Sequence, residues 1–271
     1  MAAANRPVRI GIGGWDYDPW RGVFYPPGLA KAKQLHFASR HLSAIEINAT
    51  YYKLQRPELY ERWAAEVPDG FVFTIKGSRF CTNRKILAEG REGIERFCGQ
   101  GLTRLGDKLG PILWQLADSK RFDADDIAGF FDLLPREQDG VRLRHALEAR
   151  HDSFRDERFV ELARTAGIAI CYDDSDVHPA IADPTADFVY ARLMRAREDE
   201  PEGYPPAELD RWADLVRSWS TGRADDLPKA GREVAEPPPR DVYLFMINGA
   251  KLRAPAAAQA LLRRTAPDQP R

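Results

Sequence analysis

The strongest constraint on the fold is an alternation of short β-like runs with helical patterns along most of the chain. Each run is rich in Val, Ile, Leu, Phe or Tyr, and most are bounded by Gly, Pro, Asp or Asn. Such alternation predicts parallel strands joined by helical crossovers, and eight such strands predict a closed TIM-type (β/α)₈ barrel of the α/β class. The predicted strands are 8–14, 44–48, 71–76, 112–116, 145–150, 168–173, 188–193 and 242–248.

The connections between these strands predict one regular domain with a single irregular crossover. Residues 174–187, between the sixth and seventh strands, carry no clear helical pattern. The charged segment 195–206 is predicted to be an exposed loop, and the Pro-rich segment 233–240 a connector into the last strand. We expect one domain over residues 1–271, with a core at about 8–260. The predicted helices lie within 29–42, 56–67, 92–109, 123–134, 156–167, 206–220 and 254–265.

Charge and cysteine content exclude several classes of protein. The 40 basic and 41 acidic residues give a net charge of −1, which provides no overall attraction for nucleic acid or an anionic membrane. Cys81, Cys98 and Cys171 are widely spaced and form no CxxC motif, so free thiols are favoured over disulfides or a zinc site. The sequence shows no signal peptide and no run of ~20 apolar residues, and we expect a soluble, cytoplasmic protein.

Polar residues gather at the ends of the predicted strands, where barrels of this type carry their active sites. In the stretch HALEARH (145–151), Glu148 and Arg150 lie two residues apart and therefore share one face of the strand, with His151 following. Ionised groups are costly to bury unless they are paired or functional. The candidate site comprises Trp15, Glu46, Asn48, Tyr51, Lys76, Gln115, Glu148, Arg150, His151, Asp173, Arg192 and Asn248.

Each candidate also has a purely structural interpretation. Glu148 and Arg150 could pair with neighbours inside the barrel, and His151 could cap the following helix. Lys76 could extend outward to solvent, while Trp15 and the other aromatic residues could serve packing alone. The convergence of many polar strand ends, and no single residue, favours a site.

Seven sequence blocks, in order, resemble one known family. They are IGIGGWDYDPWRGVFYP (10–26), AIEINATYYKLQRP (44–57), FVFTIKGSRFCTNRKIL (71–87), LGPILWQL (109–116), ALEARHDSF (146–154), FVYARL (188–193) and VYLFMIN (242–248). The chain resembles the domain of unknown function 72 family, the YecE-like proteins, over residues 8–260. The resemblance implies a TIM-barrel-like fold and no particular reaction. Members often carry His where this chain has Asn83, and His-Gly where it has Met194, Arg195 and Ala196 after the YARL block.

The first functional hypothesis is a hydrolase- or isomerase-type enzyme for a small anionic substrate such as a sugar phosphate or nucleotide. Lys76, Arg150 and Arg192 would supply positive charge. The predicted acid–base residues are Glu46, Glu148 and His151. The other strand-end candidates would bind the ligand, with Trp15 and Tyr51 offering aromatic faces.

The alternative hypothesis is a non-catalytic protein that binds an anion or nucleic acid at the same mouth. The basic runs 76–85, which contains Phe80, and 192–197 would contact phosphates. No cofactor is predicted, because GIGG (11–14) lacks the GxGxxG spacing of a nicotinamide or flavin fold. A metal held by Glu46, Glu148, His151 and Asp173 would require convergence that the sequence does not show, so no metal is predicted.

Overall fold

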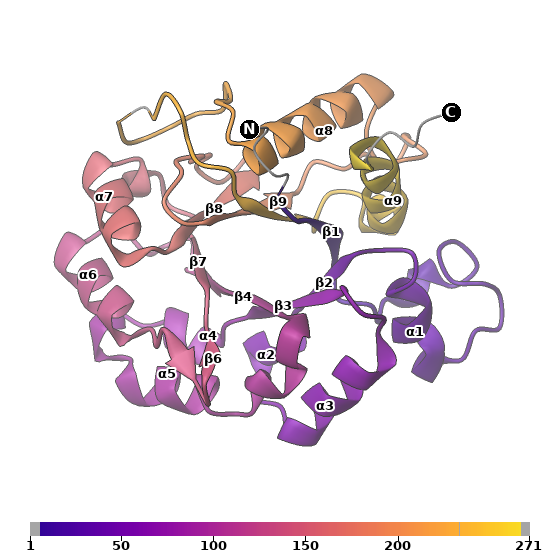
Figure 1. The fold of residues 1–271 in the computed structure, drawn as a ribbon, viewed down its shortest axis with the longest axis horizontal. Coiled ribbons are helices and arrows are strands. Elements are labelled where there is room, and N and C mark those ends of the chain that lie inside the picture. The colour runs from indigo at the N-terminus through magenta and orange to yellow at the C-terminus, as the bar shows by residue number, and fades with distance from the viewer. Residues whose placement is uncertain (1–5, 233, 267–271) are drawn as a thin grey trace.

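The computed structural model describes residues 6–232 and 234–266, and its central feature is a closed barrel of eight parallel strands. The strand order around the barrel is β1-β10-β9-β8-β7-β4-β3-β2, which confirms the predicted fold (Figure 1). The strands are β1 (Val8–Gly13), β2 (Ala44–Ile47), β3 (Val72–Lys76), β4 (Leu109–Gln115), β7 (His145–Glu148), β8 (Ala169–Asp174), β9 (Phe188–Leu193) and β10 (Asp241–Met246).

The barrel interior has an apolar floor with polar side chains above it. Alternate residues of each strand face inward, so Ala44 and Glu46 of β2 share the interior while Ile45 and Ile47 pack towards the helices. Most of the inward residues nearer the strand starts are apolar. They include Ala44, Ala146, Ala169, Phe188, Tyr190, Tyr243 and Phe245. Their polar counterparts lie one step further along, at the carboxyl ends.

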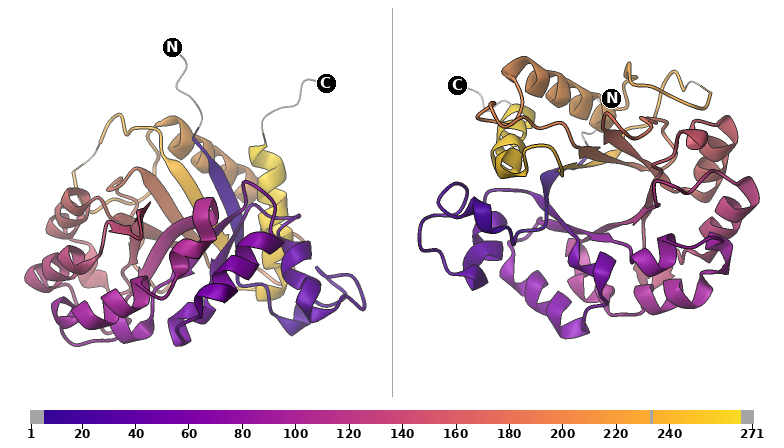
Figure 2. Two further views of the ribbon diagram at one scale, coloured as in Figure 1. Left: turned by 60° about the horizontal axis from the view of Figure 1, so that its bottom comes forward. Right: turned by 180° about the vertical axis from the view of Figure 1, so that it is seen from behind.

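Helices surround the tilted strands, as the side view in Figure 2 shows. The Asp123 side chain accepts a 3.0 Å hydrogen bond from the Asp126 N–H at the predicted start of α6. Gly167, with φ of +66°, ends α7 as predicted. The helices are α1 (Gln34–Ala38), α2 (Ala49–Tyr52), α3 (Pro57–Glu66), α4 (Arg79–Thr82), α5 (Arg91–Cys98), α6 (Ala124–Leu133), α7 (Glu157–Ala166), α8 (Pro206–Thr221) and α9 (Ala254–Thr265).

The connection between β8 and β9 contains no helix within residues 175–187, which confirms the irregular crossover. Side chains hold it in place. The Thr185 hydroxyl donates to the Ile168 carbonyl at 2.7 Å and accepts from the Ile170 N–H at 3.1 Å. The Asp183 carboxylate accepts from the Ala230 N–H at 2.7 Å, which ties the crossover to the segment before β10. Residue 233 of the predicted connector 233–240 lies outside the described residues, and 234–240 form no helix or strand.

One local prediction was wrong, and one element was missed. The helix expected over 92–109 is divided into α5 and a 3₁₀ segment, Leu102–Lys108, because Gly101 and Gly106 adopt φ of +96° and +56°. A two-stranded hairpin, β5 (Glu137–Gln138) and β6 (Val141–Arg142), was not predicted.

The cysteine and membrane expectations concern the described part of the chain. Cys81, Cys98 and Cys171 are all buried and unpaired there, as predicted. No helix in that part is both long and apolar enough to cross a membrane.

Candidate functional site

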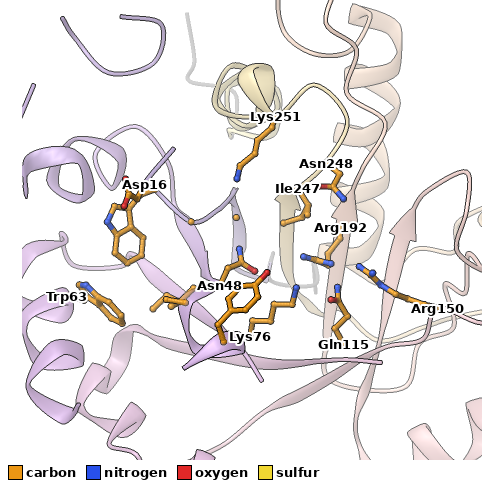
Figure 3. Close-up of a pocket in the computed structure, with 16 residues that line it drawn as sticks. Asp16, Asn48, Trp63, Lys76, Gln115, Arg150, Arg192, Ile247, Asn248 and Lys251 are labelled. Atoms are coloured by element: carbon orange, nitrogen blue, oxygen red, sulfur yellow. The ribbon is translucent and has the colours of Figure 1, made fainter. Parts of the chain in front are cut away.

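A cavity of ≈ 550 Å³ opens at the carboxyl ends of the barrel strands (Figure 3). It lies where the fold predicts a site, because the loops that follow the strands form its walls. Of the predicted candidates, Trp15, Asn48, Lys76, Gln115, Arg150, Arg192 and Asn248 line it. Gly13, Gly14, Asp16, Ile47, Ala49, Tyr52, Trp63, Ile247 and Lys251 complete the lining.

Arg192, at the end of β9, is the electrostatic centre of the cavity floor. Its guanidinium is almost fully buried and forms ion pairs with carboxylates of two strands that are not its neighbours in the barrel, β2 and β7. Nη1 lies 2.6 Å from Glu148 Oε2, and Nη2 lies 3.0 Å from Glu46 Oε1. Burial alone would lower the pKa of Arg192, but the charges of Glu148 and Glu46 outweigh burial and raise the pKa well above its ordinary value. Arg192 therefore carries a permanent positive charge in a fixed position.

Glu148 is fully buried and accepts hydrogen bonds from Gln115, Arg150 and Arg192. Oε1 accepts from Arg150 Nε at 2.6 Å, and Gln115 Nε2 donates to both carboxylate oxygens at 2.8 and 2.9 Å. Burial would raise the pKa of Glu148, but the charges of Arg192 and Arg150 outweigh it and lower the pKa to about 2. Glu148 therefore remains ionised near neutral pH and is a poor proton donor.

Glu46 lies on the opposite side of Arg192, and it too is fully buried. Tyr190 donates its hydroxyl proton to Glu46 Oε2 at 2.7 Å, so the 2.9 Å hydrogen bond from Thr74 Oγ1 must end on the Tyr190 oxygen. Burial and the Glu46 carboxylate both raise the pKa of Tyr190. Neither Glu46 nor Glu148 lines the cavity. Glu148 and Arg150 pair with each other inside the barrel, which is the structural interpretation that the sequence left open.

Lys76, at the end of β3, is a buried cation of the site with no carboxylate bound to it. Its residue is 9% exposed, and within the described chain its Nζ has no hydrogen-bond or ion-pair partner. Nζ lies 4.5 Å from the ring centroid of Tyr51, which places Tyr51 beside the lysine and not on the cavity wall. Burial, followed by the charge of Arg192, lowers the pKa of Lys76 to about 8.

The opposite wall of the cavity is aromatic. The rings of Trp15 and Trp63 meet edge to face with centroids 5.3 Å apart. The exposed Tyr52 also lines the cavity, and its ring contacts that of Tyr51. Lys251 lies above the cavity, with its Nζ 4.4 Å from the Tyr17 ring centroid (Figure 3). Sequence reasoning missed Lys251 because it examined strand ends and not the loop after β10, where NGAK (248–251) was the available signal.

The two remaining candidates, His151 and Asp173, lie outside the cavity lining. His151 Nδ1 accepts from the Ser153 N–H at 3.1 Å and caps the 3₁₀ segment Asp152–Phe154, which is the structural interpretation given above. Asp173 is buried, and burial together with Glu148 raises its pKa well above the ordinary value.

The histidine that approaches the buried carboxylates is His178, in the irregular crossover. Donor atoms of Glu148, Asp173 and His178 lie within 4.8 Å of one another. Sequence reasoning missed His178 because it lies on no strand end. A metal ion there would compete with Arg150 and Arg192 for the same Glu148 oxygens, so these residues do not form a free ligand set.

The two basic runs that suggested nucleic-acid binding differ in the structure. In the run 192–197, Arg195 pairs with Asp174 and Asp176, and Arg197 pairs with Glu208 at 2.6 Å. The run 76–85 is more open. Phe80 is 68% exposed, and its ring lies 5.6 Å from the Arg79 guanidinium.

The comparisons with known proteins fit this barrel. The family model described as "Protein of unknown function DUF72" matches residues 9–271. The chain belongs to the DUF72 family. The curated relative UPF0759 protein YunF of Bacillus subtilis (strain 168) is 33% identical over 79 residues, which cover 29% of this chain and 27% of YunF. UPF0759 protein YecE of Escherichia coli (strain K12) is 26% identical over 140 residues, which cover 51% of this chain and 48% of YecE. The chain thus spans about half or less of the length of these curated relatives.

Solved structures of DUF72 proteins share the barrel. A DUF72 family protein from Thermotoga maritima MSB8 has a TM-score of 0.69 and 21% identity, covering 94% of this chain and 97% of its own. A DUF72 family protein from Enterococcus faecalis V583 has a TM-score of 0.67 and 14% identity, covering 97% of each chain. At these identities the likeness shows the fold alone.

Proposed function

We propose that this DUF72 protein is an isomerase- or hydrolase-type enzyme that binds a small organic anion, such as a sugar phosphate or nucleotide, in the cavity. The observation that carries the proposal is the convergence of Lys76, Arg150 and Arg192 from three strands on one enclosed space. Lys251 adds a fourth positive charge, and Asp16 is the one carboxylate among the described lining residues. Guanidinium groups suit phosphate and carboxylate because they bind with two parallel hydrogen bonds.

The shape of the cavity supports a ligand with an anionic end and a ring. Its ≈ 550 Å³ volume falls within the range typical of small-molecule sites. Arg192 and Arg150 lie at one side and Trp63 at the other, as Figure 3 shows. A sugar or base can stack on the aromatic wall while the arginines hold its anionic group.

The proposed roles of the glutamates change with the geometry. Because Glu148 has a pKa of about 2 and accepts hydrogen bonds from two arginines, we assign it to holding Arg150 and Arg192 in place. Glu46 would hold Arg192 from the other side. Proton transfer to the ligand then falls to groups that line the cavity, Lys76 and Asp16.

The second candidate function is non-catalytic binding of an anion or a nucleic acid. It is favoured by the full engagement of both glutamates, since an enzyme needs a proton-transferring group within reach of its ligand. The free thiols of Cys81, Cys98 and Cys171 support a reducing compartment, and we propose the cytoplasm for either function.

Thermal unfolding in the presence of anions tests the proposal. Ribose 5-phosphate at one hundred times its Kd should stabilise the fold by about 2.7 kcal/mol, a rise in Tm of roughly 5–10 °C for a chain of this size. Arg150→Ala should abolish the rise. Arg62→Ala, at an exposed arginine on α3, is the matched control and should leave it intact.

Three results would count against this function. The first is that neutral ribose raises Tm as much as ribose 5-phosphate does. The second is that no anion raises Tm. Stabilisation by a single-stranded oligonucleotide alone would favour nucleic-acid binding at the open basic run 76–85.

A further inference from the structure

Lys76 differs from the two arginines of the cavity in having no carboxylate bound to it directly. Arg150 and Arg192 are bound to buried carboxylates at 2.6–3.0 Å. Lys76 is buried to a similar degree, yet within the described residues its Nζ forms no hydrogen bond or ion pair. Burial of the side chain withdraws the ammonium from most of the surrounding water, and the neighbouring charge of Arg192 repels it, so the surroundings favour the uncharged amine.

The charged groups around Lys76 act in opposite directions. Arg192 and Arg150 disfavour the ammonium form, whereas Glu46 and Glu148 favour it. Burial and Arg192 prevail and lower the pKa to about 8, so about a tenth of Lys76 is the free amine at pH 7. An ordinary exposed lysine has fewer than about one free amine in a thousand at that pH. A desolvated lysine beside another cation is a known arrangement for attack on carbonyl carbons.

The position of the amine also suits an attack on a bound ligand. Lys76 extends from the end of β3 into the cavity, and Figure 3 shows its side chain directed towards Arg192 and Gln115. The Thr50 hydroxyl donates to the Lys76 carbonyl at 2.7 Å and fixes the backbone at this point. A ligand whose anionic group is held by the arginines would therefore place its neighbouring carbon atoms near Nζ.

We propose that Lys76 forms a Schiff base with a small anionic aldehyde or ketone, such as a keto sugar phosphate, held by Arg150 and Arg192. This inference rests on the proposed function and names its substrate class. The Nζ lone pair attacks the carbonyl carbon, and the carbonyl π electrons move to oxygen, which takes up the proton released from nitrogen. The carbinolamine then accepts one further proton and loses water, which leaves a protonated imine. No oxidant or reductant is consumed.

The imine would explain why an isomerase needs this lysine. Its positive charge withdraws electrons from the adjacent carbon and makes the C–H bond there more acidic. That carbon can lose its proton to a cavity base such as Asp16, which leaves an enamine, and regain a proton on the opposite face. Water then hydrolyses the imine, which releases the epimerised substrate and restores the free amine. Lys76 is a catalytic residue in this scheme, because it bonds to the substrate. Arg150 and Arg192 bind the substrate's anionic group.

Reductive trapping tests the inference on the whole protein. The protein is incubated at pH 7 with dihydroxyacetone phosphate, the imine is reduced with sodium borohydride, and the modified peptide is identified by mass spectrometry. The adduct is expected on Lys76, formed roughly 100-fold faster than on exposed lysines such as Lys53, because far more of Lys76 is free amine. Lys76→Arg and Lys76→Met should both lose the adduct. Lys53→Arg, at an exposed position, should keep it.

The thermal unfolding assay on the same samples separates the two proposals. An adduct spread over exposed lysines, or formed on Lys251 in place of Lys76, would overturn the Schiff base while leaving anion binding intact if phosphate still raises Tm. An adduct unchanged in Lys76→Arg would do the same. If phosphate gives no rise in Tm and uncharged dihydroxyacetone labels Lys76 as fast as its phosphate does, the amine chemistry stands and the anion-binding function fails.

Discussion

Replacing Glu148 with glutamine tests whether the buried charge cluster stabilises the barrel. Glutamine keeps the shape of the side chain but removes its negative charge. It also turns one acceptor oxygen into an NH₂ group that must face a donor, either Arg150 Nε or Arg192 Nη1, each now 2.6 Å from the carboxylate. Arg192 would then keep its ion pair with Glu46, and Arg150 would keep only its 3.4 Å pair with the exposed Asp118.

The expected cost follows from two independent estimates. Removing one partner of a buried ion pair costs about 3–5 kcal/mol, out of a typical total stability of about 5–15 kcal/mol. A lowering of the Glu148 pKa from 4.5 to about 2 corresponds to roughly 3 kcal/mol, and the fully buried position calls for no discount for screening. Because the folded-state pKa is the lower one, this stabilisation is fully present above about pH 4.5 and is lost as the pH falls towards 2.

Urea unfolding at pH 7 and at pH 3 measures both aspects. Glu148→Gln should lower the free energy of unfolding by about 3 kcal/mol at pH 7, and the difference from the natural protein should be less than half as large at pH 3. Glu92→Gln, at an exposed position on α5, is the control and should change little at either pH. A loss below about 1 kcal/mol at pH 7, or an equal loss at both pH values, would refute the reasoning.

Two further substitutions probe neighbouring features. Asp173→Asn should leave stability unchanged or raise it at pH 7 and above. The pKa of this buried carboxyl is raised, so the natural protein loses stability as the pH rises through it and the asparagine variant does not; in urea unfolding, a loss as large as that of Glu148→Gln would contradict this. Gly11→Ala should destabilise the barrel by about 3 kcal/mol, since its Cβ would lie 1.8 Å from the Ala44 carbonyl oxygen of the next strand. Gly93→Ala, where the Cβ has only an ordinary 3.5 Å contact, is the matched control for Tm, and an equal loss in both variants would contradict the clash.

The sequence predicted the barrel well because its strands carry a strong local signal. Strand β9 (Phe188–Leu193) begins and ends as predicted, since both its apolar run and its flanking residues are clear. Strand β4 begins at Leu109, three residues earlier than expected, because Gly110 and Pro111 resemble a turn when read locally. The hairpin around Asp139 and Gly140 was missed, although an Asp-Gly pair is typical of a two-residue hairpin turn. Both residues adopt the positive φ that such a turn requires.

The candidate site was predicted less completely because contacts between strands decide it. Sequence position places Lys76, Arg150 and Arg192 at strand ends, and all three do line the cavity. Sequence position does not predict that Arg150 lines the cavity while Glu148, only two residues earlier, is buried below the cavity floor. His178 was also beyond prediction, since the irregular crossover that carries it has no periodic pattern from which its position could be inferred.

The ion pairs of Arg192 also bear on how the chain folds. Its two carboxylate partners lie 146 and 44 residues earlier in the sequence, on β2 and β7. A nascent partial barrel that ends before β9 would bury Glu46 without its cation, at a cost that such a fragment has few contacts to offset. Closure of the seam between β1 and β10 likewise joins the two ends of the described chain. We therefore expect slow folding with high contact order, in which the barrel is acquired in one cooperative transition and not strand by strand.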